Sequence, residues 1–530
     1  MEFYNLRGGK ERIFDDMNNG FGWNRLPKSF MAQNTVFLLM TALIRNFYKA
    51  IMQRLIFSDR EIKQLGGSVI EKLSIFKLLL AIAQSAYTPK DDLDWRNYSK
   101  ENFVSKVNSY LDKWHDNFFL YSDENPFLQF PILSSFKTEL KSFSTVLPQV
   151  ASGNNVLTLE SEIAFDLSDA DKARMIVAQM NFAFGGKQTD NSFSLSENYV
   201  KSKSGKVGIG LSAESYLHSY FFATTLIESI RLNLLTIKDI TSLNSFPSGL
   251  GTAPWEKMPT GEDDDIAKEY KQSLLGRLVS LGRFCLLKED GLYLTEGMFF
   301  QDHSDGVCDP SVTLYKFKNI IRALKSDPEK SPWRSLPSIL SFISLSKDKV
   351  FCAQLQLCAK RICDYLEPIA IWSAGQKVSS KCGEFKVSGK DDSVDSYIWL
   401  DKGDILSEAW YSLYAKELGD LEKLSSCLDA SIEGYLIDMK YTKIKEKNYK
   451  KKLEAQVKKF TLSFWENIEP FSQEISDRCC DLEGRKMLRH KFAQIAKKIY
   501  DEACPCNTTK QLKAWSRHQI FTGKYEQIGE

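Results

Sequence analysis

The sequence has few histidines, no long hydrophobic run and almost no excess of charge of either sign. Its 530 residues include 5 His, 70 Lys or Arg and 68 Asp or Glu, giving a formal net charge of +2. This balance excludes a strongly basic, histone-like protein but still allows local basic patches. Apolar stretches such as 35–44 are far shorter than the roughly 20 residues of a membrane helix. We therefore expect no association with a membrane.

The cysteines and the first residues bear on the cellular compartment. The chain contains 11 cysteines, which are scattered from residue 285 onward. The first residues lead directly into charged positions, so no signal peptide is expected. An odd number of cysteines without an export signal favours reduced thiols. The expected location is the cytoplasm.

The sequence shows no recognisable catalytic or metal site. Zinc sites need paired Cys or His at short spacing, and neither Cys504 with Cys506 nor Cys358 with Cys363 has a second pair to complete it. Buried thiols are the better interpretation. No histidine lies in a hydrolase, metalloprotease or deaminase motif. The acidic run 263–265 could bind a cation, but a solvated loop is the better interpretation. We expect no catalytic residue, metal or cofactor.

Hydrophobic spacing predicts a mixed N-terminal part and a helical C-terminal part. Helical periodicity is found over 30–57, 69–86, 101–117, 171–182 and 212–235. The segment 121–170 is rich in Pro, Ser, Gly and Asn, which favours strands and loops. Turn signals alternate with short strand-like runs over 250–400, and helix dominates from 404. The predicted fold class is α+β.

A glycine turn and a group of lysines follow the helix that is predicted to end at residue 182. The residues concerned are Gly185, Gly186, Lys187, Lys201, Lys203 and Lys206. Glycine lets the backbone approach a ligand closely because it has no Cβ, although such a turn is also common as a helix C-cap. With lysines nearby, phosphate contacts and a solvated loop remain equally good interpretations.

An ordered series of motifs extends over most of the chain. The motifs occupy 110–114, 125–129, 152–155, 184–186, 226–235, 254–256, 308–310, 332–334, 378–379 and 387–389. In this order they resemble the CasA family, the large subunit of the type I-E CRISPR surveillance complex (Cascade). The resemblance runs from about residue 56 to the C-terminus.

The resemblance implies a subunit without enzymatic activity that takes part in antiviral defence. Such a subunit reads a short duplex motif beside the target, the PAM, and helps to open the duplex while the guide RNA reads sequence. The implied partners are the other Cascade subunits, the guide RNA, double-stranded target DNA and the helicase-nuclease. The family segment that matches 152–160 docks near the 5′ end of the guide RNA.

In the CasA family, three loops approach the PAM through the minor groove. The resemblance assigns the glycine loop to Gly185 and Gly186, with Lys187 beside them, and the lysine finger to Lys288 by position. It places a wedge hairpin between 378 and 387. The residues near the tip of the wedge are Ser380, Lys381 and Cys382.

The resemblance also implies a C-terminal four-helix bundle that contacts duplex DNA and neighbouring subunits. Residues 431–530 contain 20 Lys or Arg and 14 Asp or Glu, a net charge of +6, which suits this role. The basic run Lys450, Lys451 and Lys452 lies in this part. An ordinary solvated helix face is the alternative interpretation.

The first residues are similar to a different family. Tyr4, Arg7 and Glu11 form the pattern Y-x-x-R-x-x-x-E, which is similar to the C-terminal end of insertion-sequence DDE transposases. The two upstream Asp residues are missing, and two-metal chemistry needs several carboxylates. We therefore interpret 1–54 as a non-catalytic remnant.

The predicted domain organisation combines both resemblances. Residues 1–54 are the transposase-like remnant, 55–403 a CasA-like globular α+β domain and 404–530 the helical bundle. Two alternatives stay open: an inactive transposase fragment fused to this frame, and a remnant of a CRISPR subunit that no longer assembles.

Overall fold

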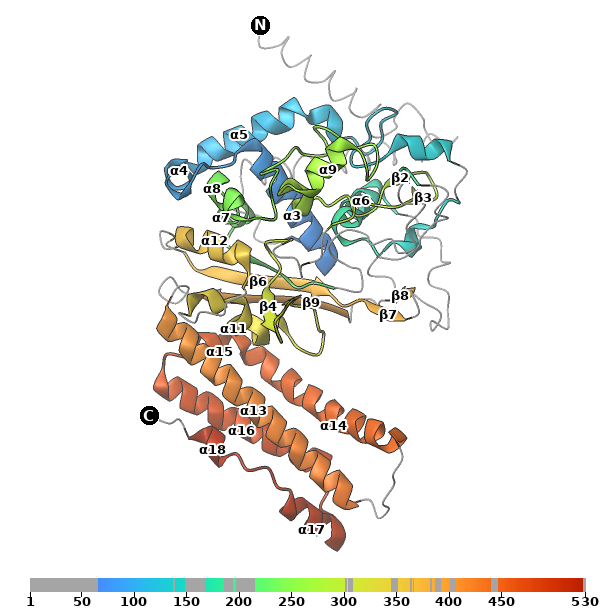
Figure 1. Ribbon diagram of the computed structural model, residues 1–530. Coiled ribbons are helices and arrows are strands. Elements are labelled where there is room, and N and C mark those ends of the chain that lie inside the picture. The colour runs from blue at the N-terminus through green and yellow to red at the C-terminus, as the bar shows by residue number, and fades with distance from the viewer. Residues whose placement is uncertain are drawn as a thin grey trace, which may run out of the picture. The chain divides into compact units, whose positions relative to one another are not determined.

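The structure is a computed structural model with two compact units (Figure 1). The described residues are 65–136, 139–147, 167–184, 194–196, 215–300, 303, 308–344, 351–362, 365, 367–381, 384–386, 392–400, 407–439 and 447–527. The first unit extends to Pro328 and includes Asp348–Asp395, and the second consists of Glu329–Lys347 and the chain from Ser396 onward. The sequence-based bundle is one stretch from 404, whereas the second unit also contains Glu329–Lys347.

A three-stranded sheet contributes to the core. Its strands are β1(His218–Phe222), β6(Ile369–Gln376) and β9(Ser393–Leu400), in the order β1-β6-β9. β1 and β6 are antiparallel, and Tyr220 lies opposite Trp372. Every residue of these two strands is buried, as expected for strands covered on both faces.

The prediction of one helix over 212–235 is wrong in its first half. Residues His218–Phe222 form β1, and the helix α7(Leu226–Leu232) begins only after them. The run His-Ser-Tyr-Phe-Phe is rich in aromatic residues, which favour a strand. Apolar periodicity alone did not separate the two elements.

Two predicted helices are confirmed and pack in the core. α3(Val69–Ala86) begins at a capping box in which Ser68 and Glu71 bond each other's backbone N–H. Its Phe76 ring lies 4.9 Å from the Tyr220 ring and 5.3 Å from that of Trp372, measured between centroids. α6(Asp169–Phe182) is the second helix.

Shorter elements complete the first unit. The other helices are α4(Asp92–Asn97), α5(Lys100–Lys113), α8(Ile237–Ser242), α9(Asp265–Lys271), α10(Leu275–Leu278) and α12(Ala353–Ile362). Antiparallel hairpins are formed by β2(Cys285–Leu287) with β3(Leu292–Leu294), β4(Leu314–Phe317) with β5(Ile320–Ala323), and β7(Ser379–Lys381) with β8(Glu384–Lys386). The described residues of 121–170 before α6 form loops and 3-10 turns and no strand, unlike the prediction.

The second unit is helical, which confirms the α+β fold class with a C-terminal helical region. Its helices are α11(Leu336–Ile339), α13(Glu408–Met439), α14(Lys447–Ile468), α15(Ser472–Arg478), α16(Leu482–Ala503), α17(Thr509–Arg517) and α18(Gly523–Glu526). Pro470 lies between α14 and α15, and Pro505 between α16 and α17. Both prolines lie at junctions, where they interrupt no helical hydrogen bond. In the described part of the chain, none of the helices combines the length and apolar character needed to cross a bilayer.

Candidate nucleic-acid interface

A buried arginine holds the backbone just before the predicted glycine loop. The Phe184 carbonyl accepts hydrogen bonds from Arg283 Nη2 at 2.9 Å and Nε at 3.3 Å, and Arg283 Nη1 donates to the Thr295 carbonyl at 3.1 Å. Arg283 is only 2% exposed. Burying a guanidinium is costly unless its donors are satisfied, so these bonds define one conformation. Gly185, Gly186 and Lys187 themselves lie outside the described residues.

Close backbone packing supports the same region. The Gly282 N–H donates to the Met180 carbonyl at 2.7 Å. A Cβ added at Gly297 would lie 2.0 Å from the Gly282 carbonyl oxygen. Only glycine therefore fits at this crossing, and the end of α6 is fixed to the chain that leads into β2.

Lys288 lies in the turn that joins β2 to β3. Its N–H donates to the Gly291 carbonyl at 2.8 Å, and its ammonium lies 5.9 Å from the centre of the Tyr293 ring. The Lys288 side chain is exposed. Lys172 from α6 donates to the Glu289 carbonyl at 3.2 Å, which adds a second cation to this turn. Arg283 lies two residues before the first strand of this hairpin, so the structure brings together the start of the predicted glycine loop and the hairpin of Lys288.

The predicted wedge segment forms a hairpin. In the β7–β8 register, Ser380 lies opposite Phe385, and Lys381 lies opposite Glu384. At its base, the Val378 N–H donates to Ser215 Oγ at 2.7 Å. Cys382 lies outside the described residues. The structure thus confirms that the predicted wedge segment forms an antiparallel hairpin. Contact of this hairpin with DNA stays a prediction.

The lysines of the C-terminal part belong to the second unit. Lys450, Lys451 and Lys452 are exposed on α14, and the next residue, Leu453, is buried. Lys450 Nζ lies 3.9 Å from Glu454 Oε1, an exposed pair that stabilises the fold little. These cations are therefore available to solvent. Lys201, Lys203 and Lys206 fall outside the described residues.

The cysteines show no metal site in the described residues, where no group of three or more His, Cys, Asp or Glu could hold an ion. Burial raises the pKa of both Cys358 and Cys504 to about 12, so these thiols stay protonated. Cys506 is exposed, which corrects the prediction that it is buried. Cys363 lies outside the described residues.

The acidic run 263–265 serves the N-terminus of α9. Asp264 is the N-cap, and its carboxylate accepts from the Ala267 N–H at 2.6 Å. Asp265 is exposed and pairs with Lys268 at 2.9 Å. Asp263 and Asp264 are only partly exposed and Asp265 begins α9, so the run is the start of a helix and not the solvated loop that we expected.

A buried ion pair crosses the core, and sequence reasoning missed it. Lys77 Nζ of α3 lies 2.8 Å from Asp309 Oδ2, and both side chains are almost completely buried. Burial opposes ionisation of Asp309, but Lys77 and the neighbouring His218 lower the pKa of this carboxyl well below its usual range. His218 Nδ1 lies 2.8 Å from Ser311 Oγ, and burial lowers its pKa to about 3. The sequence did contain a signal for this pair, because Lys77 is a charged residue within an apolar stretch of helix α3.

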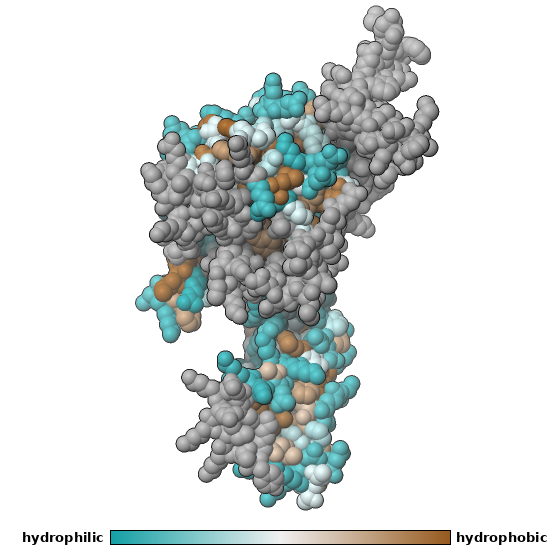
Figure 2. All heavy atoms as spheres, turned by 90° about the vertical axis from the view of Figure 1, so that its right-hand side faces the viewer, coloured by the Kyte–Doolittle hydropathy of each residue, from teal (hydrophilic) through white to brown (hydrophobic). Residues whose placement is uncertain are grey.

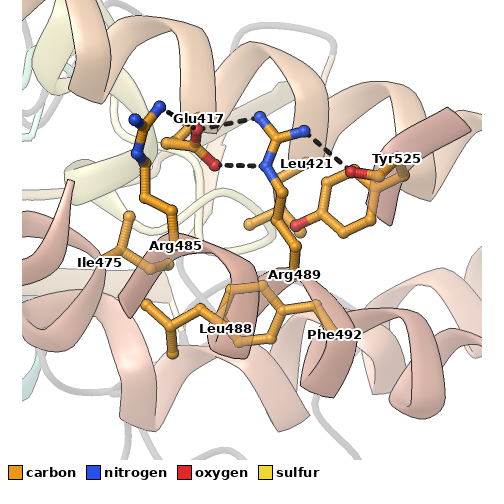
Figure 3. Close-up of a pocket in the computed structure, with 8 residues that line it drawn as sticks. All are labelled: Glu417, Leu421, Ile475, Arg485, Leu488, Arg489, Phe492 and Tyr525. Atoms are coloured by element: carbon orange, nitrogen blue, oxygen red, sulfur yellow. Dashed lines mark hydrogen bonds and ion pairs between the residues drawn. The ribbon is translucent and has the colours of Figure 1, made fainter. Parts of the chain in front are cut away.

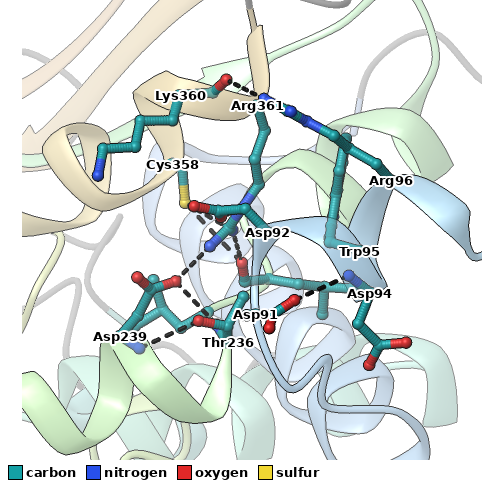
Figure 4. A network of polar contacts seen from close by, with 12 residues as sticks. Asp91, Asp92, Asp94, Trp95, Arg96, Thr236, Asp239, Cys358, Lys360 and Arg361 are labelled. Carbon is teal, nitrogen blue, oxygen red and sulfur yellow. Dashed lines mark hydrogen bonds and ion pairs between the residues drawn. The ribbon is translucent and has the colours of Figure 1, made fainter.

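A second buried charge joins three helices of the first unit (Figure 4). Arg361 of α12 is fully buried and donates to Asp92 Oδ1 of α4 at 2.8 Å. It also bonds Asp239 of α8 and the Leu234 carbonyl. Asp239 in turn forms a capping box with Thr236. Every partner is part of the protein itself, so this network stabilises the fold.

The small pocket of the second unit is also structural (Figure 3). Glu417 of α13 accepts from Arg489 Nε at 2.8 Å and from Arg485 Nη1 at 3.4 Å. Arg489 also donates to the Tyr525 carbonyl at 2.8 Å and to Asp420 at 2.7 Å. The polar contacts therefore connect α13, α16 and α18.

Motifs that carry the family resemblance contact one another. Tyr110 donates to Glu256 Oε1 at 2.7 Å and accepts from Trp255 Nε1 at 2.7 Å. The Trp255 ring also packs 5.4 Å from Phe118 and 6.3 Å from Phe127, measured between ring centroids. The described residues of these motifs thus stabilise the fold by packing against one another, and they do not form a chemical site.

Comparison with known proteins gives one consistent family. The model of the CRISPR-associated protein Cse1 family matches residues 50–504. The protein CasA/Cse1 of Thermus thermophilus is 33% identical over 127 residues, which are 22% of this chain and 24% of the relative. The matched stretch therefore spans about a quarter of that curated relative.

Solved structures share the fold along most of the chain. The crystal structure of Thermus thermophilus CasA has a TM-score of 0.68 and 18% identity, covering 90% of this chain and 94% of its own. Thermobifida fusca Cse1 has a TM-score of 0.67 and 17% identity, with 90% and 93% covered. A chain of a CRISPR RNA-guided surveillance complex has a TM-score of 0.62 and 14% identity, with 88% and 94% covered. With the family model matching most of its length, this chain belongs to the CRISPR-associated Cse1 (CasA) family.

Proposed function

We propose that this chain is the large subunit of a type I-E CRISPR surveillance complex, in which it reads the PAM and helps to open the target duplex. Family membership and the fold shared with a chain of such a complex support this proposal. The observation that carries it is the bond from Arg283 to the Phe184 carbonyl, which fixes the start of the predicted glycine loop beside the Lys288 hairpin.

The proposed mechanism divides the work among three loops. Bare backbone at Gly185 and Gly186 fits against the floor of the minor groove, where readout is degenerate and PAM choice is correspondingly relaxed. Lys288 contacts the duplex from the adjacent hairpin. The tip of the β7–β8 hairpin enters the first base step, and the few kcal/mol of lost stacking are offset by new contacts. No bond chemistry is assigned to the chain.

The proposed partners follow from this role. Other Cascade subunits and the guide RNA would form the complex, the target duplex would be bound, and the helicase-nuclease would be recruited to it. The basic residues of the second unit would contact phosphates, which makes binding weaker at high salt. The proposed location is the cytoplasm.

Co-expression with the other subunits and a guide RNA tests this proposal. We expect the full chain to co-purify with the ribonucleoprotein on size exclusion. A folded chain that elutes alone would instead support the alternative of a remnant that no longer assembles. Residues 1–54, which carry the transposase resemblance, lie outside the described residues. Strand transfer with Mg²⁺ by the full chain would support the alternative of a transposase fragment.

A further inference from the structure

The β4–β5 hairpin presents one face to the core and the other to solvent. Lys318 and Asn319 form its turn with φ of 49° and 67°, as in a type I′ turn. On the inner face, Leu314 and Ala323 lie opposite each other and are buried in a cluster with Tyr216. The hairpin is therefore held firmly at its base.

The outer face is both aromatic and basic. It carries Tyr315, Phe317 and Ile320, which are 37%, 44% and 54% exposed. The Arg322 guanidinium lies 4.7 Å and the Lys318 ammonium 5.4 Å from the centre of the Phe317 ring. Figure 2 shows a narrow projection on the left, at the height of this hairpin, where hydrophobic and hydrophilic residues lie side by side.

The charge of this segment has one sign. Residues 311–326 contain four cations and no Asp or Glu. Within the part of the chain that the structure describes, Lys316, Lys318 and Arg322 form no ion pair at 4.0 Å or less. A polyanion would therefore complement the hairpin, whereas a partner with a neutral apolar surface would leave these cations without compensation.

An exposed aromatic ring among cations suits single-stranded nucleic acid. Unpaired bases stack on aromatic side chains in a sequence-tolerant way, while Lys and Arg neutralise the phosphates. Bases inside a duplex are already stacked and cannot use such a ring. The Phe317 side chain faces solvent, so its burial against a base would add a contact that the fold does not use.

The base of this hairpin lies beside the base of the predicted wedge. Ser326 Oγ donates to the Tyr216 carbonyl at 3.2 Å, and Ser215 Oγ accepts from the Val378 N–H at 2.7 Å. Lys377, just before β7, pairs with Asp327 at 3.1 Å. Adjacent residues thus anchor both hairpins, so a strand released at one would emerge close to the other.

We propose that the outer face of the β4–β5 hairpin binds single-stranded nucleic acid. That this face lies beside an opened duplex rests on the proposed function. Binding of a single strand by the purified chain alone does not depend on that function. The chemistry fits a strand of DNA or RNA, with Phe317 stacking on a base and Lys318 and Arg322 contacting phosphates.

Binding of fluorescent oligo(dT), oligo(U) and a duplex DNA to the purified full chain tests this proposal. We expect Phe317→Ala to weaken binding of a single strand by roughly tenfold and to change duplex binding much less. Preference for oligo(dT) or oligo(U) distinguishes DNA from RNA as the ligand. Lys318→Gln with Arg322→Gln should also reduce the salt dependence of single-strand binding.

Matched variants serve as controls. Phe521→Ala removes another exposed ring, which is 76% exposed, and Lys238→Gln with Lys257→Gln removes two other exposed cations. Both controls should bind like the unmodified chain, and all variants should keep its thermal midpoint because the side chains are exposed. Unchanged single-strand binding in both hairpin variants would overturn the proposal. If the hairpin variants kept single-strand binding but lost another subunit on co-purification, the outer face would be a protein interface and the proposal would be wrong. If the unmodified chain bound single strands but did not assemble with the other subunits, only the proposed function would be overturned.

Discussion

Arg283 and Phe184 are 99 positions apart in the sequence, and the guanidinium of one holds the carbonyl of the other at 2.9 Å. Phe184 is the last described residue before Gly185 and Gly186, and Arg283 lies two residues before the strand that leads to Lys288. This bond joins the residue that precedes the predicted glycine loop to the segment that leads into the Lys288 hairpin, and the predictions below test the proposed role of both in DNA recognition.

Replacing Arg283 should impair recognition. Arg283→Lys keeps a positive charge but lacks the planar guanidinium fork that bonds the Phe184 and Thr295 carbonyls at once, so the start of the glycine loop should lose its fixed position. We expect the ratio of affinities for duplexes with and without the PAM to fall about tenfold, and stability to fall by about 1–3 kcal/mol. The affinity ratio is measured in the assembled complex, and the stability by urea unfolding. An unchanged ratio in the destabilised variant would mean that this arginine only supports the fold.

Bulky side chains at Gly185 and Gly186 should abolish PAM-dependent binding without unfolding the protein. A leucine at either position would separate the backbone from the groove floor, because its side chain occupies that space. Filter binding of the assembled complex measures the effect. Gly419→Ala is the matched control, since a Cβ at Gly419 meets nothing within 4 Å. Unaltered binding by the double glycine variant would remove the glycine-loop assignment.

Replacing Lys450, Lys451 and Lys452 with Ala should flatten the salt dependence of DNA binding. Each lost phosphate contact lowers the slope of log K against log salt by about 1. Affinity should fall to a similar extent for all sequences, because phosphate contacts carry no sequence information. Lys423→Ala on α13 is the control. A slope equal to that of the unmodified chain would identify the three lysines as a solvated face.

Acid should destabilise the first unit through His218. Burial lowers the pKa of this imidazole to about 3, so the folded state stays unprotonated where the unfolded state, near pKa 6.5, takes up a proton. Between these values the unfolded state binds more protons, and stability must fall as the pH falls. This one group contributes at most about 1.4 kcal/mol per pH unit. Urea unfolding at pH 7 and pH 5 measures the difference, which His218→Gln should reduce. An equal pH dependence in the unmodified chain and the variant would contradict the prediction.

Local patterns were enough to predict much of the fold. The apolar spacing of 69–86 and 171–182 predicted α3 and α6, and the dominance of helix after 404 predicted the helical C-terminal region. β1 was missed because a short buried apolar run has no period that separates strand from helix. The β4–β5 hairpin had a signal, alternating residues around Lys318 and Asn319, that went unused.

Contacts between residues far apart in the sequence, in the core and in the candidate site, were not accessible to this reasoning. Lys77 and Asp309 are 232 positions apart, and only the tertiary fold brings them together. The bond between Arg283 and Phe184 is equally remote in sequence. Spacing rules describe neighbours within one element, so they identified loops but not the side chains that hold them in place.

The affinity of the reconstituted complex for its target duplex, with and without this chain and with the PAM intact or scrambled, tests the central claim most directly. We predict that adding the chain tightens binding only when the PAM is intact, by about tenfold or more. Equal affinity for intact and scrambled PAM in the presence of the chain would contradict the account.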